Sequence, residues 1–420
     1  MHTKIIKQAA ALMVTLCLMP EVSSGEGFRN PPGSASLVGR ISGQVAHADG
    51  PSAIYLNPAN LVSVTNLSVL ASLSYGYAQR EFDSAISKRE KTSDPWAVLP
   101  SVYAAWPIKD REYVVGIGIS TPMGRSSKWD DDVIFRFTSP TYAELGVVNV
   151  NPTIAMRLSK RLSFGVGIDL YYSSFKFRQF LPFSALTGVP TDPEGKAEFD
   201  GEGFGIGGNV GFTLQLAENH QVALYYRSAY DVEYDGDFDI SDLPGAAAAI
   251  GASSSSDFET EIDFPSIIAL GYGIQVTKSL RLGADIEWIE HSRFEELKVD
   301  LDNNNVLLPT TALPQGWEDN WAFGLGCDWR YSPEWLLRLG FYHFETPIQN
   351  DNLFLPLLYE NDHQFISIGL GYTKNGHAID VAFAYGIFED QTVTDHPDPT
   401  LNGKYDIDSQ VLSVSYKREL

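Results

Sequence analysis

Three things are scarce in this chain: cysteine, positive charge and long apolar runs. Only 2 of its 420 residues are cysteines, too few for a disulfide scaffold. Lys and Arg number 30 against 53 Asp and Glu, and the resulting formal net charge of -23 argues against binding nucleic acid, which requires a basic face. Beyond the first residues, no segment approaches the roughly 18 consecutive apolar residues of a transmembrane helix. Glycine (36) and aromatic residues (Tyr 20, Phe 23, Trp 8) are plentiful instead, a bias typical of β-structure.

The first segment has the composition of a secretory signal peptide. Two lysines precede an apolar run over residues 9–19, which is too short to cross a bilayer, and small residues follow it. We expect residues 1–24 to form this signal peptide, with cleavage near Ser24. Lipoprotein processing at Cys17 is the alternative. In both cases the protein is exported.

The exported part alternates between apolar and small or polar residues. Around residue 166, for example, the residues of one parity are apolar: Leu162, Phe164, Val166, Ile168 and Leu170. A period of two predicts strands, and many of these segments exceed the roughly 9–11 residues that cross hydrocarbon at a tilt. Backbone groups in lipid must all be paired within the protein, so such a sheet has to close. The sequence therefore predicts an all-β fold, a transmembrane antiparallel β-barrel with its apolar face toward lipid. A soluble β-sandwich or propeller is the alternative.

Counting the alternating segments gives 14 candidate strands, an even number as in bacterial single-chain barrels. The candidates are 67–79, 98–107, 111–121, 145–158, 161–178, 204–216, 219–234, 258–276, 280–298, 318–332, 334–346, 364–375, 376–388 and 405–419. Short connections alternate with long ones, so we expect short periplasmic turns and long external loops. Residues 25–66 lack alternation and must either hang in the periplasm or fold into the lumen, whereas residues 67–420 form the barrel.

Several motifs resemble the FadL/TodX family of outer-membrane transporters. The stretch GRISGQVAHADGPSAIYLNPANL (39–61) is similar to the family's N-terminal signature, which ends in Asn-Pro-Ala. Further similar stretches follow in order: ISTPMGRSSKW (119–129), VNPTIAMRLSKRLSFGVGIDLYY (150–172), GFGIGGNVGFTLQL (203–216), ALYYRS (223–228), LGADIEW (282–288) and RLGFYHFETPIQND (338–351). The resemblance covers nearly all of the mature chain. It implies a monomeric 14-stranded barrel, with an N-terminal hatch inside the lumen, that carries long-chain fatty acids, aromatic hydrocarbons or other hydrophobic molecules inward.

Two positions depart from the family's pattern. Asn60 stands where the family has glycine after Asn-Pro-Ala, and asparagine tolerates the left-handed backbone that a turn can require. The chain ends on Leu420 rather than on an aromatic residue. Leu420 keeps the parity of Val414 and Tyr416, so the terminus still presents an apolar residue to lipid. The barrel-insertion machinery that reads such a terminus is an expected partner.

Motifs for enzymes, cofactors and metals are weak. GFGIGG (203–208) matches the dinucleotide fingerprint, but the alternation continues past it as a strand where that fingerprint requires a helix. No G-x-S-x-G or H-E-x-x-H occurs, and the histidines have no ligand spacing. Acidic runs such as 130–132 lack the spacing of a calcium loop and are interpreted as solvated loop charge, with divalent cations that bridge to lipopolysaccharide as the alternative. We expect no enzyme, no cofactor and no bound metal; a Ser-His lipase is the enzymatic alternative, because a triad needs no sequence motif.

Apolar residues on two long loops are candidates for substrate capture. They are Phe180, Leu181, Phe183 and Leu186 on one loop and Leu243 and Ile250 on the other. Exposed apolar patches mark binding sites, so we expect a capture groove here; packing of the loops into a lid is the alternative. For the carboxylate of a fatty acid the candidate partner is Arg178, where the fifth strand runs into the capture loop. Glu318 beside the family's Gly-aromatic pair makes a neutral hydrocarbon an equally good cargo.

Two further segments are candidate parts of the path. Asn57, Pro58 and Ala59 are predicted to form a hatch turn near an internal pocket, because Pro58 fixes φ and holds the preceding residue extended. The third strand meets Pro122, Met123 and Gly124. Proline in a barrel wall is expected only at edges, bulges or bends. The resemblance implies that this strand bends inward and opens a gap for lateral release of cargo; a plain strand end is the alternative.

The predicted function is passive uptake of hydrophobic small molecules, either fatty acids or hydrocarbons, across the bacterial outer membrane. External loops capture the cargo, an internal pocket binds it, and it leaves sideways through the wall. Outer-membrane lipids and lipopolysaccharide are expected partners. A general porin for small hydrophilic solutes is the alternative, which the hatch-like N-terminus and the apolar loops disfavour.

Overall fold

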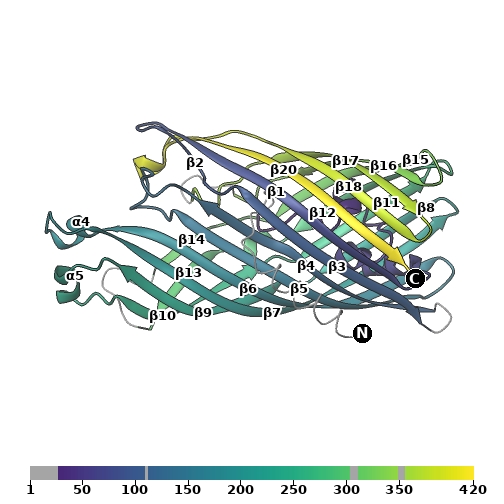
Figure 1. Ribbon diagram of the computed structural model, residues 1–420, viewed down its shortest axis with the longest axis horizontal. Coiled ribbons are helices and arrows are strands. Elements are labelled where there is room, and N and C mark those ends of the chain that lie inside the picture. The colour runs from purple at the N-terminus through teal and green to yellow at the C-terminus, as the bar shows by residue number, and fades with distance from the viewer. Residues whose placement is uncertain (1–26, 109–111, 303–310, 349–354) are drawn as a thin grey trace.

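The wall of the protein is a closed antiparallel β-barrel (Figure 1), seen in a computed structural model that describes residues 27–108, 112–302, 311–348 and 355–420. Its fourteen strand positions are filled by β1 (Ser68–Ser84), β3 (Trp96–Ile108), β4 (Tyr113–Lys128), β5 (Tyr142–Arg157), β6 (Leu162–Pro182), β7 (Glu194–Ala217), β8 (His220–Arg227) with β9 (Tyr230–Ser241), β10 (Ser255–Phe264) with β11 (Ile267–Gln275), β12 (Leu280–Ile289) with β13 (Glu296–Leu301), β15 (Asn320–Arg330), β16 (Trp335–Phe344), β17 (His363–Lys374), β18 (His377–Phe388) and β20 (Gly403–Glu419). Short strands β2 (Arg89–Lys91), β14 (Thr311–Pro314) and β19 (Gln391–Val393) extend the outer hairpins. β1 pairs with β20 from Ser68↔Glu419 to Ser84↔Gly403, which closes the ring. The predicted fold and strand number are confirmed; the predicted signal peptide lies outside the described residues.

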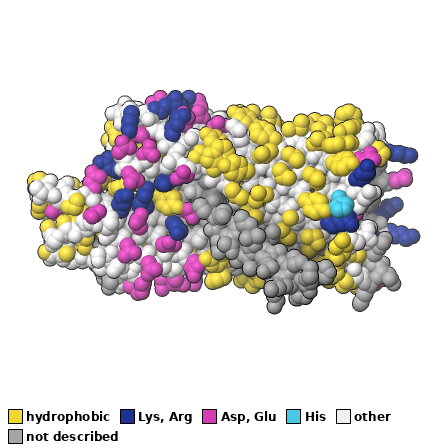
Figure 2. All heavy atoms as spheres, viewed as in Figure 1, with side chains coloured by type: hydrophobic (Ala, Val, Ile, Leu, Met, Phe, Trp, Pro, Cys, Tyr) yellow, Lys and Arg dark blue, Asp and Glu magenta, His cyan; other side chains and the backbone are white. Residues whose placement is uncertain are grey.

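The outer surface of the wall follows the alternation in the sequence. On β17, Ile366, Ile368 and Leu370 are exposed, whereas Ser367 between them is buried in the lumen. Hydrophobic side chains gather in a band nearer the end where the C-terminus lies, and charged side chains gather toward the opposite end (Figure 2). An apolar band on a closed barrel is the surface that lipid tails require. The apolar parity therefore faces lipid, as predicted.

The strands run well past the membrane on the outer side. β6 has 21 residues and β7 has 24, against the roughly 9–11 that cross hydrocarbon. The expected end of the third strand at residue 121 is wrong, since β4 continues to Lys128, and β5 already begins at Tyr142. Pairing continues here without an apolar face because the ladder is held by backbone hydrogen bonds. The alternation that marks a strand in the sequence stops where the wall leaves the lipid.

Three wall positions are interrupted at the level where the outer extension starts. β8 and β9 are separated at Ser228 and Ala229, β10 and β11 at Pro265 and Ser266, and β12 and β13 at residues 290–295. The sequence predicts each of these pairs as one continuous strand. Pro265 cannot donate to a ladder, which explains one of the breaks. Beyond them the extension continues in the same sheet, with β9 paired to β7 and β10.

Short helices occupy two places in the fold. α2 (Ala35–Val38), α3 (Ala53–Leu56) and the 3-10 helix η1 (Pro58–Ser63) contact the inner wall, α2 against β17, β18 and β20, and η1 against β5, β6 and β7. α4 (Phe183–Thr187) and α5 (Gly245–Ala249) contact each other at the outer tips, and η3 (His291–Arg293) and η5 (Pro399–Leu401) lie in outer connections. No helix of the described chain is both long and apolar enough to span a membrane.

Candidate functional site

Residues 27–64, here called the hatch, fold inside the barrel. Most of them are buried although they form only two short helices and one 3-10 helix. The barrel wall supplies the hydrogen bonds that the hatch cannot make within itself. Ser415 of β20 accepts from the amide of Ala35 at 2.7 Å, and Ser367 of β17 donates to the carbonyl of Gly39 at 3.1 Å. Two strands of the wall that have only β18 between them are thus tied to one segment.

Buried charges fix the middle of the hatch to the wall. The carboxylate of Asp285 on β12 accepts from the backbone amides of Gln44 at 2.6 Å and Val45 at 3.1 Å. Arg40 of the hatch pairs with Asp328 on β15 at 2.9 Å. A buried charge is tolerated when it is paired and hydrogen-bonded, so these wall carboxylates and the hatch depend on each other.

Asn57, Pro58 and Ala59 form a turn against β6 and β7. The Asn57 side chain accepts from the amide of Ala59 at 3.0 Å and donates to the carbonyl of Val45 at 2.9 Å. The turn touches wall glycines so closely that a side-chain carbon on Gly211 would lie 2.0 Å from the Asn57 amide oxygen. These three residues therefore organise the hatch, and they do not line the apolar cavity described below.

The inward bend of β4 lies at Pro122, Met123 and Gly124. Pairing of β3 with β4 runs from Ile108↔Tyr113 to Val102↔Ile119 and stops there. The register of β4 with β5 shifts between Ser120 and Met123, which is the sign of a bulge. Residues 120–125 are all buried, so this part of β4 lies inside the barrel. The strand does not end here, since it continues to Lys128.

The hatch takes the place of a neighbouring strand at this bend. The amide of Asn30 donates to the carbonyl of Pro122 at 3.0 Å, and the amide of Gly124 donates to the carbonyl of Phe28 at 2.8 Å. Farther out, an isolated bridge joins Thr92, which lies between β2 and β3, to Trp129, which directly follows β4, so the two segments meet again there. Within the described residues, the β3–β4 ladder is therefore open between Ile119 and Trp129 and closed on both sides. We call this stretch the wall gap.

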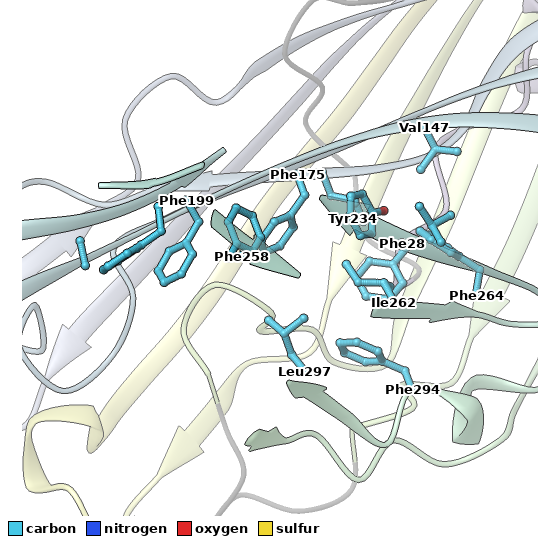
Figure 3. Close-up of a cluster of buried hydrophobic side chains, with 14 of the residues drawn as sticks. Phe28, Val147, Phe175, Phe199, Tyr234, Phe258, Ile262, Phe264, Phe294 and Leu297 are labelled. Carbon is cyan, nitrogen blue, oxygen red and sulfur yellow. The ribbon is translucent and has the colours of Figure 1, made fainter. Parts of the chain in front are cut away.

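A cluster of buried apolar side chains connects the outer loops with the bend (Figure 3). Near the loop tips it contains Phe183 of α4 and Ala247 of α5, and at the inner end it contains Met123 of β4 and Phe28 of the hatch. Between these ends lie mainly aromatic residues: Phe175, Phe199, Tyr234, Phe258, Phe264, Phe294 and Trp317. An apolar cluster thus runs through the interior of the outer extension, although the surface of the extension is acidic.

A narrow cavity of about 50 Å³ lies within this cluster. Its walls are almost entirely apolar: Phe28, Leu145, Phe175, Phe177, Ile262, Phe294, Leu297, Leu355, Leu357 and Leu358, with Ala143, Arg125, Ser127 and Glu144 completing the lining. The lining residues come from the hatch, from β4, β5, β6, β10 and β13, from the connection between β12 and β13, and from the loop before β17. Sequence reasoning missed these residues. The apolar run Leu355–Leu358 in an otherwise polar loop is the signal that could have indicated some of them.

Arg125 is the cationic residue in the lining of this cavity, and its guanidinium donates hydrogen bonds to other groups of the protein. It donates from Nε to the carbonyl of Leu357 at 3.1 Å and from Nη2 to that of Tyr359 at 2.6 Å. Its Nη1 donates to the carbonyl of Gly27 at 2.8 Å and pairs with Glu360 at 3.2 Å. Glu360 also accepts from the amide of Gly27 at 2.6 Å. Arg125 therefore joins the hatch to the loop before β17.

The predicted capture residues divide into buried and exposed ones. Phe180, Leu181 and Phe183 are buried beneath the loop surface, and Leu243 packs against the same cluster. Leu186 and Ile250 are exposed, at 45% and 56%. Arg178 pairs with Asp131 at 3.0 Å, stacks over the ring of Phe180, and is not among the lining residues of the cavity. The apolar residues that stay exposed to solvent at the loop tips include Leu186 and Ile250.

Carboxylates also gather on the outer surface. Oxygens of Asp231, Glu261 and Asp263 lie within 4.8 Å of one another, as do those of Glu90, Asp130 and Asp132. Arg293 pairs with Asp231 at 2.7 Å, and Lys88 pairs with Asp132 at 2.9 Å. Both groups are thus partly neutralised by side chains of the protein itself.

His291 lies in the connection between β12 and β13, and it contacts the lining of the cavity indirectly, through Trp317. Its Nδ1 is 2.6 Å from the amide oxygen of Asn320, and its ring packs edge-on against Trp317, which stacks on Phe28. Its Nε2 is buried and has no partner in the described chain. Burial lowers the pKa of His291 to about 4, against the opposing effect of the Asn320 hydrogen bond.

Acid is therefore expected to loosen this part of the protein. A lowered folded pKa means that the stabilisation is complete above the unfolded value, near 6.5, and is lost as the pH falls through about 4. Full protonation would cost about 3 kcal/mol. The thermal unfolding midpoint of wild type should fall between pH 7 and 4 by more than that of His291→Gln, which keeps a donor for Asn320 but cannot become charged. Equal falls in the two proteins would contradict this assignment.

A closed barrel with a folded segment in its lumen, a gap in its wall and an apolar path from the outer loops defines an outer-membrane transport protein. The profile of the family described as "Outer membrane protein transport protein (OMPP1/FadL/TodX)" matches residues 17–420, and the chain belongs to this family. Membership places the protein in the outer membrane and among transport proteins rather than enzymes.

Individual relatives are distant but cover nearly the whole chain. The chain is 24% identical over 422 residues to the long-chain fatty acid transport protein of Escherichia coli O6:H1, with 92% of each chain covered. It is 25% identical over 414 residues to that of Salmonella typhi, covering 92% of this chain and 93% of the other. Among solved structures, a Pseudomonas aeruginosa FadL homologue has a TM-score of 0.82 at 18% identity, covering 94% of this chain and 100% of that one. The P. putida toluene transporter TodX has a TM-score of 0.69 at 17% identity, covering 88% and 94%.

Proposed function

We propose that this protein takes up hydrophobic small molecules, such as long-chain fatty acids or aromatic hydrocarbons, across the outer membrane by passive diffusion. The observation that carries the proposal is the unbroken apolar cluster from the loop tips to the bend of β4. Apolar side chains inside an extension that stands in water offer hydrophobic cargo a favourable route past the polar lipopolysaccharide layer. Uptake of labelled oleate and toluene by cells with and without the gene tests this; equal uptake would contradict it.

The path has three parts. Cargo first meets the exposed apolar residues at the loop tips, where α4 and α5 lie together. It then enters the cavity between Phe28, Phe175 and Phe294, which opens as side chains rotate. Finally it leaves sideways into the outer leaflet through the wall gap. On the inner face beside the gap, Ala78 of β1 packs with Ala97 and Leu99 of β3.

Lateral release is favoured by what lies beneath the cavity. The hatch fills the lumen there, and charged pairs such as Arg29 with Glu287 at 2.7 Å stand in the way of apolar cargo. Moving a hydrocarbon chain past desolvated ion pairs gains nothing, whereas lipid beside the gap is as apolar as the cavity. Pro122, Met123 and Gly124 are the gate residues of this proposal.

Capture should depend on the few apolar residues that are exposed at the loop tips. The double variant Leu186→Ser/Ile250→Ser should lower uptake a few-fold at low substrate concentration and leave it unchanged at saturation, because it removes a collecting surface and not the cavity. The control is Ile86→Ser, which removes an apolar side chain of similar exposure (62%) from another outer loop. Loss of uptake in the control as well would indicate a general surface effect.

The porin alternative predicts a different measurement. A porin passes small hydrophilic solutes, so liposomes that contain it swell in sugar solutions. The hatch hydrogen bonds across the lumen argue for little swelling. Swelling as fast as that with a known porin would favour the alternative.

The partners that we propose are the barrel-insertion machinery and lipopolysaccharide of the outer membrane. Leu412, Val414 and Tyr416 on β20 are exposed on the outside, as recognition of the last strand by the barrel-insertion machinery requires, and Leu420 follows them. The outer extension stands among lipopolysaccharide sugars. We propose a monomer, since the barrel closes on itself and needs no second copy.

A further inference from the structure

A further cavity, of about 480 Å³, lies at the end of the lumen opposite the outer loops, away from the proposed path of hydrophobic cargo. Hatch residues 46–49 line one side of it, and the turns after β5 and β7 line the other. Short turns of an outer-membrane barrel face the periplasm, so this cavity opens to the periplasmic solution. Its volume lies within the range of about 300–1,000 Å³ that is typical of small-molecule sites. We call it the periplasmic cavity.

Three cations in the lining of the periplasmic cavity have no ion pair in the described chain. They belong to one hairpin: Arg157 is the last residue of β5, and Lys160 and Arg161 lie in the turn to β6. Arg157 has the parity of Ala155, which is buried on the lumen face, and its Nη2 donates to the carbonyl of Val62 in the hatch at 2.8 Å. The hairpin therefore places positive charge against the base of the hatch.

The other charged residues of the lining do not balance these three cations. Arg281 pairs with Asp49 of the hatch and with Asp328 of β15. Glu218 is the one acid of the lining that has no ion pair among the residues that the structure describes. Three unpaired cations against one unpaired acid leave the cavity positive, although the whole chain has a formal net charge of -23.

Cations at the outer end of the barrel have carboxylate partners instead. In the outer extension as far as it is described, every lysine and arginine at the surface is paired; Lys176 with Asp200 and Arg136 with Glu194, both at 2.9 Å, are examples. Lys and Arg side chains also stand at the end of the barrel where the C-terminus lies (Figure 2). The hairpin that carries residues 157–161 therefore keeps its cations available for an anion from outside the protein.

The donors in the periplasmic cavity suit a phosphate group. The lining adds hydroxyl and amide groups to the three cations, from Ser159, Ser163, Gln215 and Asn219. A phosphate monoester carries about 1.5 to 2 negative charges at pH 7 and offers three strong acceptor oxygens. Arginine and lysine are the side chains that recognise phosphate. A single carboxylate would leave more of the positive charge without a partner.

We propose that the periplasmic cavity binds a phosphate ester, with Arg157, Lys160 and Arg161 as its cationic ligands. This site is separate from the apolar cavity, and the inference goes beyond the proposed uptake of hydrophobic molecules. The phosphate group is available from two sources, a soluble phosphate ester of the periplasm and the headgroup of a phospholipid in the inner leaflet.

A bound phosphate ester would contact the hatch and the wall together, because both line the same cavity. A ligand that binds one arrangement of a protein stabilises that arrangement. We therefore expect the ligand to hold the hatch in its closed position and to slow hydrogen exchange of the backbone amides of residues 46–49.

The test titrates purified protein in phosphatidylcholine nanodiscs with glycerol 3-phosphate, and with glycerol as the uncharged counterpart. Wild type should bind the phosphate ester and not glycerol, and added salt should weaken this binding. The double variant Lys160→Gln/Arg161→Gln should bind about 10- to 100-fold more weakly, because it removes two of the three cations.

The matched control is Lys278→Gln/Lys374→Gln. These two lysines lie at other periplasmic turns, have no ion pair in the described chain and do not line the cavity. The control removes the same amount of charge and should bind as wild type. All four substituted residues are exposed, so both double variants should fold.

Three results would overturn the proposal. Equal weakening in the two double variants would mean that the general charge of the periplasmic end attracts phosphate. Binding of succinate as tightly as glycerol 3-phosphate would mean that the cavity selects double negative charge and not phosphate. Absence of binding by wild type would remove the site altogether. None of these results bears on uptake of oleate or toluene, so the proposed function is tested separately.

Nanodiscs that contain phosphatidylglycerol distinguish the two sources of phosphate. If a lipid headgroup fills the cavity, phosphatidylglycerol should compete with glycerol 3-phosphate in wild type, and hydrogen exchange of residues 46–49 should be slow before any ligand is added. If phosphatidylglycerol has no effect, the phosphate ester comes from the periplasmic solution, and glycerol 3-phosphate alone should slow the exchange. Exchange that stays unchanged in both kinds of nanodisc would contradict contact between the ligand and the hatch.

Discussion

A covalent link across the wall gap is expected to reduce uptake to the level of cells that lack the protein, while ligand binding persists. The link keeps β3 and β4 together at the place where their ladder is open, between Ile119 and Trp129. The capture loops lie outside this segment, and the cavity touches it only through Arg125 and Ser127, so cargo should still enter and bind. It could no longer leave into the membrane, and the path through the hatch is blocked by buried ion pairs.

Cysteines at Leu99 and Pro122, joined by a short bifunctional maleimide, would make this link. Continuing the register Val102↔Ile119 by three positions places these two residues opposite each other. The control pair is Ala104 and Ile117, which are already paired below the gap. Both pairs are built on Cys327→Ser. Normal uptake by the folded, cross-linked gap pair would exclude lateral release and favour a moving hatch. The variant Gly124→Phe, whose side chain fills the bend, should also reduce uptake.

Removing the hatch should turn the protein into an open pore. A barrel of this strand number is intermediate between filled 8-stranded barrels and 16-stranded porins, so an empty lumen admits water and ions. Deletion of residues 28–60 should therefore give large, steady conductance in planar bilayers, where wild type shows little. A folded deletion variant that still does not conduct would show that the hatch is not the plug.

A single substitution also tests whether the hatch keeps the lumen closed. Asp285→Ala leaves the buried amides of Gln44 and Val45 without an acceptor, at about 1–3 kcal/mol for each. Brief openings should become frequent in bilayer recordings. The control Asp285→Asn keeps one acceptor oxygen at the same place and should open less often. If both variants are as closed as wild type, these hydrogen bonds do not hold the hatch shut.

The strands of the wall could be predicted from the sequence because their side chains alternate between two faces with a period of two residues. A strand between lipid and lumen must change character at every residue, and this is visible in a single sequence, as in Ile366, Ser367 and Ile368. The outer ends of the strands could not be placed in this way. Beyond the lipid both faces of the wall tolerate polar residues, so the pattern that marks β4 disappears before Lys128, where the strand ends.

The path was harder to predict for a different reason. Arg125 and Glu360 are 235 residues apart, and the sequence around neither residue indicates that the other is its partner. Sequence reasoning selected Phe180, Leu181 and Phe183 because they are apolar and lie on a loop, but the loop packs on its neighbour and buries them. Arg178 was chosen for its place in the chain, whereas its ion pair with Asp131 depends on the register of the outer sheet.

The close fit between hatch and wall glycines has a consequence for how the protein is made. A side-chain carbon on Gly340 would lie 1.7 Å from the carbonyl oxygen of Arg40, and one on Gly283 would lie 1.9 Å from that of Gly43. A fit without room for a methyl group leaves no clearance for threading the hatch into a finished ring. We expect assembly to follow a fixed order, in which the N-terminal segment waits between the growing hairpins and the last seam, β1 with β20, joins around it.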